Sequence, residues 1–466
     1  MPAPSSREET ATLLDRIREV DPRICSVSDL DPTAAEQAAL RDEELAAGNR
    51  RSPLHGRPVL VKDNIDTAGL ATTAGSLALA GSPPDRDAEL VRRLRAAGMV
   101  VLGKTNLSEW ANIRSLSSTS GWSAYGGLTR NPYALNRSSG GSSSGSGAAV
   151  AAGLAPFAIG TETDGSIICP AAFNGCVGIK PTVGAVPTSG VVPISPSQDS
   201  PGPLARTVRD AAALLSVLTG DGVDHAAHAV ADGLVGKRIG VPRRGLWGYS
   251  EPADAAAEHA LGLMAAAGAT LVDGTDLPGL AEFDWELELV VMLTELVPAL
   301  AGYLASRDGA PRSLAEVVEF NRAHADQELS WFGQDLFERA LELPAADSAE
   351  YGAARAACLQ LARGGIDGVL AEHRLDALVA PSMAPALPID LVNPEHHAGG
   401  CTSPSAMAGY PIISVPSGLP HGLPVGISFW AGAGSETTLI EIASGYETAR
   451  DADSGPLPPP TLPTFV

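Results

Sequence analysis

A lysine stands at the end of an apolar run in the segment GRPVLVKDNID (residues 56–66). Lys62 directly follows Val59, Leu60 and Val61, and it is one of only four lysines in the chain. Because an ammonium group is costly to bury, this pattern by itself favours a strand-end lysine that reaches water. If the strand ends inside the protein instead, lost hydration lowers the pKa of the amine, and a neutral amine can act as a base.

Two further segments contain serines that could carry out acyl transfer. Ser142 begins the triple serine of GGSSSGSG (residues 140–147), and Ser166 ends GTETDGS (residues 160–166), 24 positions later. Amide hydrolysis needs a nucleophile, a base, an acid for the leaving amine and donors for the oxyanion. A lysine can replace histidine as the base in such a site. Taken alone, however, a glycine-containing turn such as GTETDGS indicates only a reversal of the chain.

Two other segments match the sequence patterns of known functional sites, but only in residue type. GMVVLGKT (residues 98–105) fits the phosphate-binding P-loop pattern, but its middle residues Met-Val-Val-Leu favour a strand, whereas a P-loop needs a loop there. GSSSG (residues 141–145) fits the nucleophile elbow and would make Ser143 the attacking residue, with Asp376 and His421 as partners. The segment before it is polar and rich in turn residues, whereas an elbow follows a buried strand. We therefore predict neither site.

The chain resembles the amidase signature family in several blocks. The Gly/Ser-rich segment 130–184, which contains both serines, is similar to the family signature almost throughout. Residues 54–66, 100–111 and 408–429 are similar to further blocks of the family. The resemblance implies an α/β fold, in which a central mixed, twisted β-sheet is covered on both faces by helices. It also implies an amide hydrolase that needs no cofactor and no metal.

The resemblance assigns roles to three side chains. Ser166 is expected to attack the substrate carbonyl and form an acyl-enzyme. Ser142, preceded by an unusual cis peptide bond, is expected to relay the proton, and Lys62 is expected to be the terminal base in its neutral form. Four polar residues in matching blocks are expected to support the site without reacting: Asp63, Asn64, Asn106 and Glu109.

The turn before Ser166 departs from a common family pattern. Many members carry two glycines there, whereas this chain has Asp164 and Gly165. This form is most similar to the bacterial peptide amidase subgroup, which removes C-terminal amide groups from peptides. By position in the motif, the backbone N–H groups from Thr163 to Ser166 are expected to bind the oxyanion. The Asp164 carboxylate could bind a substrate N–H or cation, or it could only cap a helix or bond to its own loop. The sequence leaves both open.

Helix and strand patterns alternate along the chain, which predicts an α/β fold independently of the resemblance. Apolar runs at 58–62 and 98–104 predict strands on either side of an amphipathic helix at 87–98. Residues 116–147 have the composition of a linker, yet they lead directly into an apolar stretch. Further elements are predicted as follows: helices at 5–20, 207–220 and 435–450, and strands at 374–382 and 409–419.

We expect a single amidase domain over residues 1–466. Its predicted parts are an N-terminal helical segment (1–50), a catalytic core (51–224 and 371–450), a helix-rich insertion or peripheral layer (225–370) and a Pro-rich tail (451–466).

The overall charge narrows the range of partners. The chain has 54 acidic and 32 basic residues, and its formal net charge is −22. An acidic surface disfavours nucleic acids and anionic membranes as partners. The first residues show no secretory signal, the apolar stretch 147–160 is too short to span a bilayer, and the five scattered cysteines predict neither disulfides nor a zinc site. We therefore expect a cytoplasmic monomer or homodimer that acts on a small-molecule or peptide amide.

Two other functions remain open. An amidotransferase A-type subunit shares the fold and the Ser-Ser-Lys set, but it passes ammonia to a tRNA-bound substrate and needs partner subunits. The acidic charge argues mildly against a surface that faces nucleic acid. A nucleotide-binding protein, suggested by GMVVLGKT, is a remote alternative.

Overall fold

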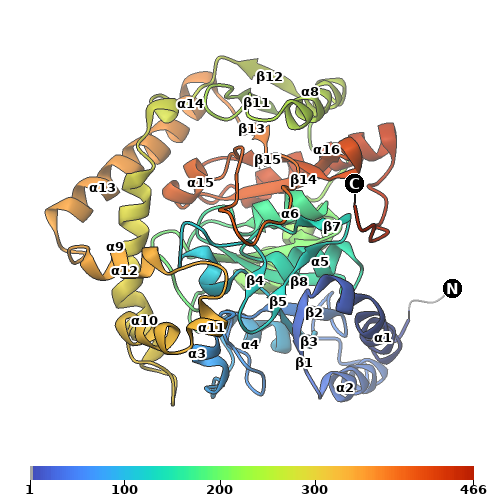
Figure 1. The fold of residues 1–466 in the computed structure, drawn as a ribbon. Helices are drawn as coiled ribbons and strands as arrows, with labels where there is room; N and C mark the ends of the chain where they lie inside the picture. The colour runs from blue at the N-terminus through green and yellow to red at the C-terminus, as the bar shows by residue number, and fades with distance from the viewer. Residues whose placement is uncertain (1–3, 466) are drawn as a thin grey trace.

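The computed structural model describes residues 4–465, and its centre is one mixed β-sheet of 11 strands. Strand β2 pairs in parallel with β3 and β8, whereas β8 pairs antiparallel with β10. In spatial order the strands are β1 (Val27–Leu30), β3 (Val100–Thr105), β2 (Pro58–Lys62), β8 (Phe157–Glu162), β10 (Ser200–Ala205), β9 (Val177–Lys180), β14 (Ile412–Gly418), β15 (Val425–Trp430), β13 (Ala377–Pro381), β11 (Arg238–Val241) and β12 (Thr270–Asp273). Helices flank this sheet (Figure 1), which confirms the predicted α/β fold.

Alternate residues of β2 belong to two different hydrophobic clusters, one on each face of the sheet. Val59 and Val61 pack in a cluster that includes helices α4 (Glu89–Ala96), α7 (Val208–Thr219) and α16 (Glu436–Ser454). Leu60 belongs to the cluster formed by α1 (Ser6–Ile24), α2 (Ala34–Ala46) and α5 (Ser144–Ala151). Because side chains alternate along a strand, Lys62 points to the same face as Leu60, where α5 lies.

The elements predicted from hydrophobic patterns are present. Helices α1, α7 and α16 correspond to the predicted helices near the start, middle and end of the chain, and β2, β3, β13 and β14 correspond to the predicted strands. The polar tract 116–147 differs from the linker that its composition suggests. It forms four short strands, β4 (Trp122–Ser123), β5 (Gly127–Leu128), β6 (Arg130–Asn131) and β7 (Ala134–Ser138), before α5 begins.

Buried hydrogen bonds explain how such a polar tract can pack inside the protein. The Asn106 amide donates to the carbonyl oxygens of Gly121 and Gly127 and to Thr129 Oγ1, and its Oδ1 accepts from Ser123 Oγ at 2.7 Å. Polar groups can be buried when they are paired in this way.

Residues 225–370 are mostly helical, but they also contribute β11 and β12 at one end of the sheet. Helices α9 (Glu286–Leu304) and α13 (Ala349–Leu359) lie along one side of the molecule, with the shorter α10 (Leu314–Ala323) and α12 (Asp335–Glu342) nearby (Figure 1). This segment is therefore joined to the sheet by strand pairing. The division of the chain into a single domain with these parts stays a prediction.

Helix α9 is the one helix in residues 4–465 that is long and apolar enough to cross a membrane, judged by length and composition. Half of its most apolar window (50%) is buried inside the protein. Val291 packs in one hydrophobic cluster, and Leu293, Leu296 and Leu300 pack in another. These contacts are those of a helix packed within the fold.

Candidate active site

Lys62, at the end of β2, is completely buried, and oxygen atoms surround its amine. Its Nζ lies 2.7 Å from Ser142 Oγ, 3.0 Å from Ser143 Oγ and 2.9 Å from Thr161 Oγ1. The carbonyl oxygen of Thr161 is 3.2 Å away. Lys62 therefore does not reach water as a strand-end lysine does on a surface.

The environment of Lys62 favours the neutral amine. Burial lowers the pKa of Lys62 well below the usual 10.5, because desolvation outweighs the more distant carboxylates of Glu162 and Asp199. Among the described residues, no carboxylate forms an ion pair with Lys62. The buried Lys104 is different, because its Nζ lies 3.5 Å from Asp63 Oδ1.

Ser142 lies in the turn between β7 and α5 and is completely buried. The peptide bond between Gly141 and Ser142 is cis, as the resemblance implies. The backbone N–H of Ser108 donates to the Ser142 carbonyl at 3.1 Å. A Cβ at position 141 would lie 2.3 Å from Ser108 Oγ, so a larger residue there would have to displace Ser108. Tight packing therefore determines where the Ser142 hydroxyl lies.

Ser166 lies in the turn between β8 and α6 (Ile168–Asn174), next to the Ser142 turn. The backbone N–H of Ser143 donates to the Ser166 carbonyl at 3.1 Å, which joins the two turns. Gly165 has φ = +76°, a left-handed conformation that glycine adopts without strain. The Ser166 side chain is not sealed off, since the residue is 8% exposed and lines a cavity.

The structure thus brings Lys62 and Ser142 into direct contact and places Ser166 in the adjacent turn. Among residues 4–465, the hydrogen bonds of Ser142 Oγ do not include one to Ser166 Oγ. The link between the two turns in this structure runs through backbone atoms.

Glu162 holds the start of α6 and was not predicted as a site residue. Its Oε2 accepts hydrogen bonds from the backbone N–H groups of Ile167 (2.7 Å) and Ile168 (2.9 Å). Burial raises the pKa of Glu162, whereas the Lys180 ammonium and these two N–H donors lower it.

We expect Glu162→Ala to reduce the free energy of unfolding by about 2–4 kcal/mol, because it leaves two buried N–H donors unsatisfied. Urea unfolding of the variant and the wild-type protein measures this loss. Glu162→Gln is the matched control, since it keeps an acceptor oxygen and should lose much less stability. Equal stability of Glu162→Ala and wild type would contradict this role.

A cavity of about 490 Å³ opens beside Ser166. The predicted oxyanion residues Thr163, Asp164 and Gly165 all line it. Most of the other lining residues are uncharged: Ala111, Asn112, Ile113, Ser115, Leu116, Ser118, Ser120, Gly141, Cys169, Ile194, Leu289, Met292, Leu336, Met383 and Thr402. Glu395 and His397 complete the lining.

Asp164 makes a contact that neither alternative for it had included. Its Oδ2 accepts a hydrogen bond from Ser403 Oγ at 2.5 Å, at the start of α15 (Ser403–Ala408). Its Oδ1 is buried and has no hydrogen-bond partner among the described residues. Burial raises the pKa of Asp164. One oxygen therefore anchors the turn to α15, and the other has unused capacity.

Asp199 and Thr161 are further residues around the site that were not predicted. Thr163 Oγ1 donates to Asp199 Oδ1 at 2.6 Å, and burial raises the pKa of Asp199 to about 6. Asn64 donates to Thr161 Oγ1 at 2.9 Å, the same oxygen that contacts Lys62. Thr161 lies within the GTETDGS motif, and its closeness to Ser166 in the sequence could have marked it as a site residue. No motif contained Asp199.

The two rejected motifs fold as expected from their composition. Ser143 is completely buried, and its Oγ donates to the Thr161 carbonyl at 3.1 Å, so it is not presented at an elbow. Asp376 instead accepts from the backbone of Arg238, and His421 lies in a short 3₁₀ turn at 420–422.

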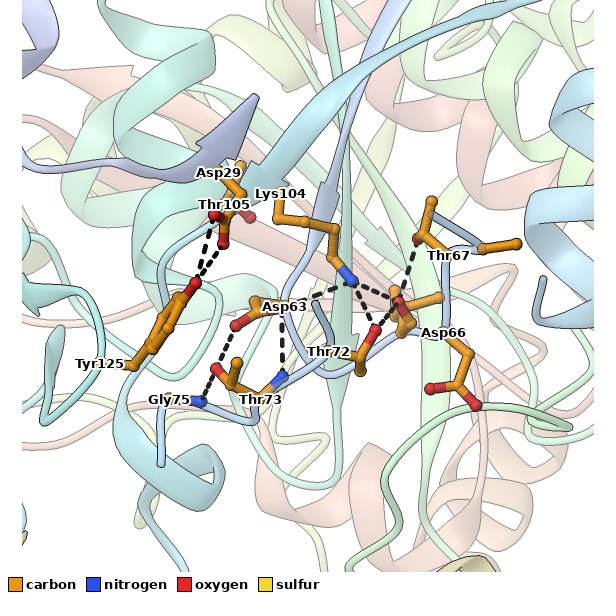
Figure 2. A network of polar contacts seen from close by, with 12 residues as sticks. Asp29, Asp63, Asp66, Thr67, Thr72, Thr73, Gly75, Lys104, Thr105 and Tyr125 are labelled. Atoms are coloured by element: carbon orange, nitrogen blue, oxygen red, sulfur yellow. Dashed lines mark hydrogen bonds and ion pairs between the residues drawn. The ribbon is translucent and has the colours of Figure 1, made fainter. Parts of the chain in front are cut away.

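Figure 2 shows the surroundings of Lys104, the lysine of the P-loop match. Lys104 lies within β3, and its Nζ donates to the Ile65 carbonyl (2.5 Å) and to Thr72 Oγ1 (3.0 Å). Asp63 also accepts a hydrogen bond from Thr73, and Tyr125 donates to Asp29. The contacts of Lys104 tie β3 to the segment that follows β2, and the motif residues form a strand rather than a phosphate-binding loop.

Comparison with known proteins identifies the class. The family described as Amidase matches residues 8–440, and the chain belongs to this family, the amidase signature family. The native peptide amidase from Stenotrophomonas maltophilia has a similar structure, with a TM-score of 0.91 and 47% identity over 97% of this chain and 95% of that one.

Curated relatives of similar length include two kinds of protein. A probable amidase of Arabidopsis thaliana is 38% identical over 96% of this chain and 87% of its own length. The A-type subunit of the glutamyl-tRNA(Gln) amidotransferase of Salinispora arenicola is 37% identical over 98% of this chain and 96% of its own length. Together with the family match and the similar peptide amidase, these findings make the chain an amide hydrolase, an enzyme that cleaves amide C–N bonds.

Proposed function

We propose that hydrolysis proceeds through an acyl-enzyme on Ser166, with Ser142 and Lys62 as proton relay and base. The observation that carries this proposal is the buried Lys62 amine, 2.7 Å from Ser142 Oγ and without a carboxylate partner among the described residues. Desolvation lowers the pKa of such an amine and so favours its neutral form, which can accept a proton.

The proposed reaction has two halves. Ser166 Oγ bonds to the carbonyl carbon and passes its proton to Ser142, whose own proton goes to Lys62 Nζ. The C–N bond then breaks, and the proton returns through Ser142 to the leaving nitrogen, so that an amine or ammonia departs. In the second half, water attacks the acyl-enzyme by the same proton route and releases the carboxylic acid and free Ser166.

The turn before Ser166 supplies the proposed oxyanion hole. The backbone N–H groups of Asp164, Gly165 and Ser166 donate to no acceptor in the described part of the chain. These residues, with Thr163, line the cavity. Free N–H groups at fixed positions stabilise the negative charge of a tetrahedral intermediate.

We propose a carboxamide substrate, such as the C-terminal amide of a short peptide. A cavity of about 490 Å³ with apolar walls from Leu289, Met292 and Met383 suits a small apolar or peptide acyl group. The likeness to a peptide amidase supports this choice. We further propose a cytoplasmic enzyme that works as a monomer or homodimer, without nucleic acid, membrane or cofactor.

An amidotransferase A-type subunit is the second candidate, because relatives with that name match nearly the whole chain. Ammonia for such an enzyme comes from a substrate that is itself an amino acid, and recognition of its carboxylate favours an Arg or Lys. Among the residues that line the cavity there is neither. The lining therefore favours the simple amidase.

The test is whether the purified single chain releases ammonia. We expect it to release ammonia from peptide amides such as N-acetylphenylalaninamide without any added partner protein, and a coupled ammonia assay measures this. The same assay with free glutamine is the control and should give a much lower rate. Activity that appears only with glutamine and added partner subunits would favour the amidotransferase alternative.

A further inference from the structure

Glu395 is a buried carboxylate on the wall of the reaction cavity. It lies in the segment that joins β13 to α15, and its neighbours His396 and Ala398 are exposed. Its own side chain is only 4% exposed and lines the same cavity as Ser166. A glutamate on an exposed loop usually points to water, because its charge is costly to bury. The inward position of Glu395 therefore needs an explanation.

The contacts of Glu395 within the chain leave one oxygen unused. Its Oε1 accepts a long hydrogen bond from Ser138 Oγ at 3.4 Å. Its Oε2 lies 3.2 Å from His397 Nε2, but it has no hydrogen-bond partner among the described residues. The His397 side chain is 46% exposed, so a ligand can displace it at little cost. Oε2 is thus a buried acceptor, on a side chain that lines the cavity, and a donor on a ligand could satisfy it.

The other charged groups on the cavity wall reinforce the negative character of this position. Asp164 is the second carboxylate, and its Oδ1 also has no hydrogen-bond partner among residues 4–465. The lining contains no Lys or Arg to balance the two carboxylates. A negatively charged acyl group would be repelled there, whereas a positively charged one would be attracted.

We propose that Glu395 forms a subsite for a cationic group, an ammonium or guanidinium, on the acyl part of the substrate. This proposal rests on the proposed amidase function, and it adds a preference for amides whose acyl group carries a positive charge. The alternative is that Glu395 only holds its loop to Ser138, in which case the charge of the substrate would not matter.

Two pairs of amides test the subsite. Phenylalaninamide, with a free ammonium group, is compared with N-acetylphenylalaninamide, and N-acetyllysinamide is compared with N-acetylnorleucinamide. We expect the wild-type enzyme to have a higher kcat/KM for the cationic member of at least one pair, by about ten- to a hundredfold. In Glu395→Gln, which keeps the shape and the acceptor for Ser138, this preference should fall to about unity.

Glu372→Gln is the matched control, since Glu372 is exposed on α14 (Gly365–His373). This substitution changes the net charge by the same amount as Glu395→Gln. It should keep the wild-type preference. If both members of each pair react equally well with the wild type, or if Glu395→Gln lowers both by the same factor, the proposal is wrong. If no amide is hydrolysed at all, the proposed function fails instead.

Inhibition of the wild-type enzyme gives a second test that does not depend on the folding of a variant. Phenethylamine and 2-phenylethanol have nearly the same shape, and only the amine is charged at pH 7. We expect the amine to inhibit competitively at an about tenfold lower concentration. Equal inhibition by the two compounds would overturn the proposal.

Discussion

Ser166→Ala is expected to lower kcat for amide hydrolysis by about a millionfold, to the background of the assay. The proposed acyl-enzyme forms on Ser166 Oγ, and the cavity, the oxyanion donors and the Lys62–Ser142 pair cannot replace that atom. The change removes one hydroxyl from a residue that is 8% exposed, so the fold should not be disturbed. Steady-state ammonia release, with circular dichroism to confirm folding, measures the effect.

Ser143→Ala is the matched control for this experiment. Ser143 lies beside Lys62 and is the attacking residue that the elbow pattern would select. Its variant should still form the acyl-enzyme, which mass spectrometry detects as acylation on the peptide that contains Ser166. Acylation on Ser143, or wild-type turnover by Ser166→Ala, would show that the nucleophile has been assigned wrongly.

Lys62→Arg is expected to reduce kcat by about 10³- to 10⁴-fold, although it keeps a positive charge and a long side chain. The guanidinium cannot lose its proton in a protein, so it cannot act as the base. Lys62→Met, which removes the amine and keeps the length, should be equally slow. The kcat of both variants, measured beside the wild type, tests the requirement for a neutral amine.

The pH dependence of wild-type activity tests the same requirement for a neutral amine. Burial lowers the pKa of Lys62, and the base works only after it loses its proton. The kcat/KM value should therefore rise with pH through this lowered pKa and level off below the usual 10.5 of lysine. That rise should be absent from the residual activity of Lys62→Met.

Lys237→Met is the control for the loss of a lysine, because the Lys237 side chain is partly exposed and paired with Glu441 at 2.7 Å. It should keep wild-type activity and the same pH profile. A Lys62→Arg enzyme with normal activity would mean that a charged group suffices and that the neutral-base mechanism is wrong.

The proposed catalytic residues come together because each lies at or near one end of a strand or helix. Lys62 ends β2, Ser142 precedes α5 and Ser166 follows β8, which pairs in parallel with β2. The parallel pairing brings the ends of β2 and β8 to one edge of the sheet, and α5 packs over the face to which Lys62 points. Local sequence sets each turn, but only the sheet places them together.

The sequence by itself determined the family, the α/β class and the main strands and helices, because hydrophobic periodicity and a long Gly/Ser-rich signature are local properties. It also singled out Lys62, Ser142 and Ser166, although the role of each came from resemblance. The composition of residues 116–147 was misleading, since their polar groups are paired inside the protein rather than hydrated.

Only the tertiary structure decided the environment of each ionisable group. Lys62 and Lys104 are both buried and lie on the neighbouring strands β2 and β3. The amine of Lys62 faces hydroxyl groups, whereas that of Lys104 faces the Asp63 carboxylate. Glu395 reaches the cavity from a segment far along the chain, and no motif marks it. A pKa depends on desolvation and on neighbouring charges within a few ångströms, and such neighbours come together only when the chain is folded.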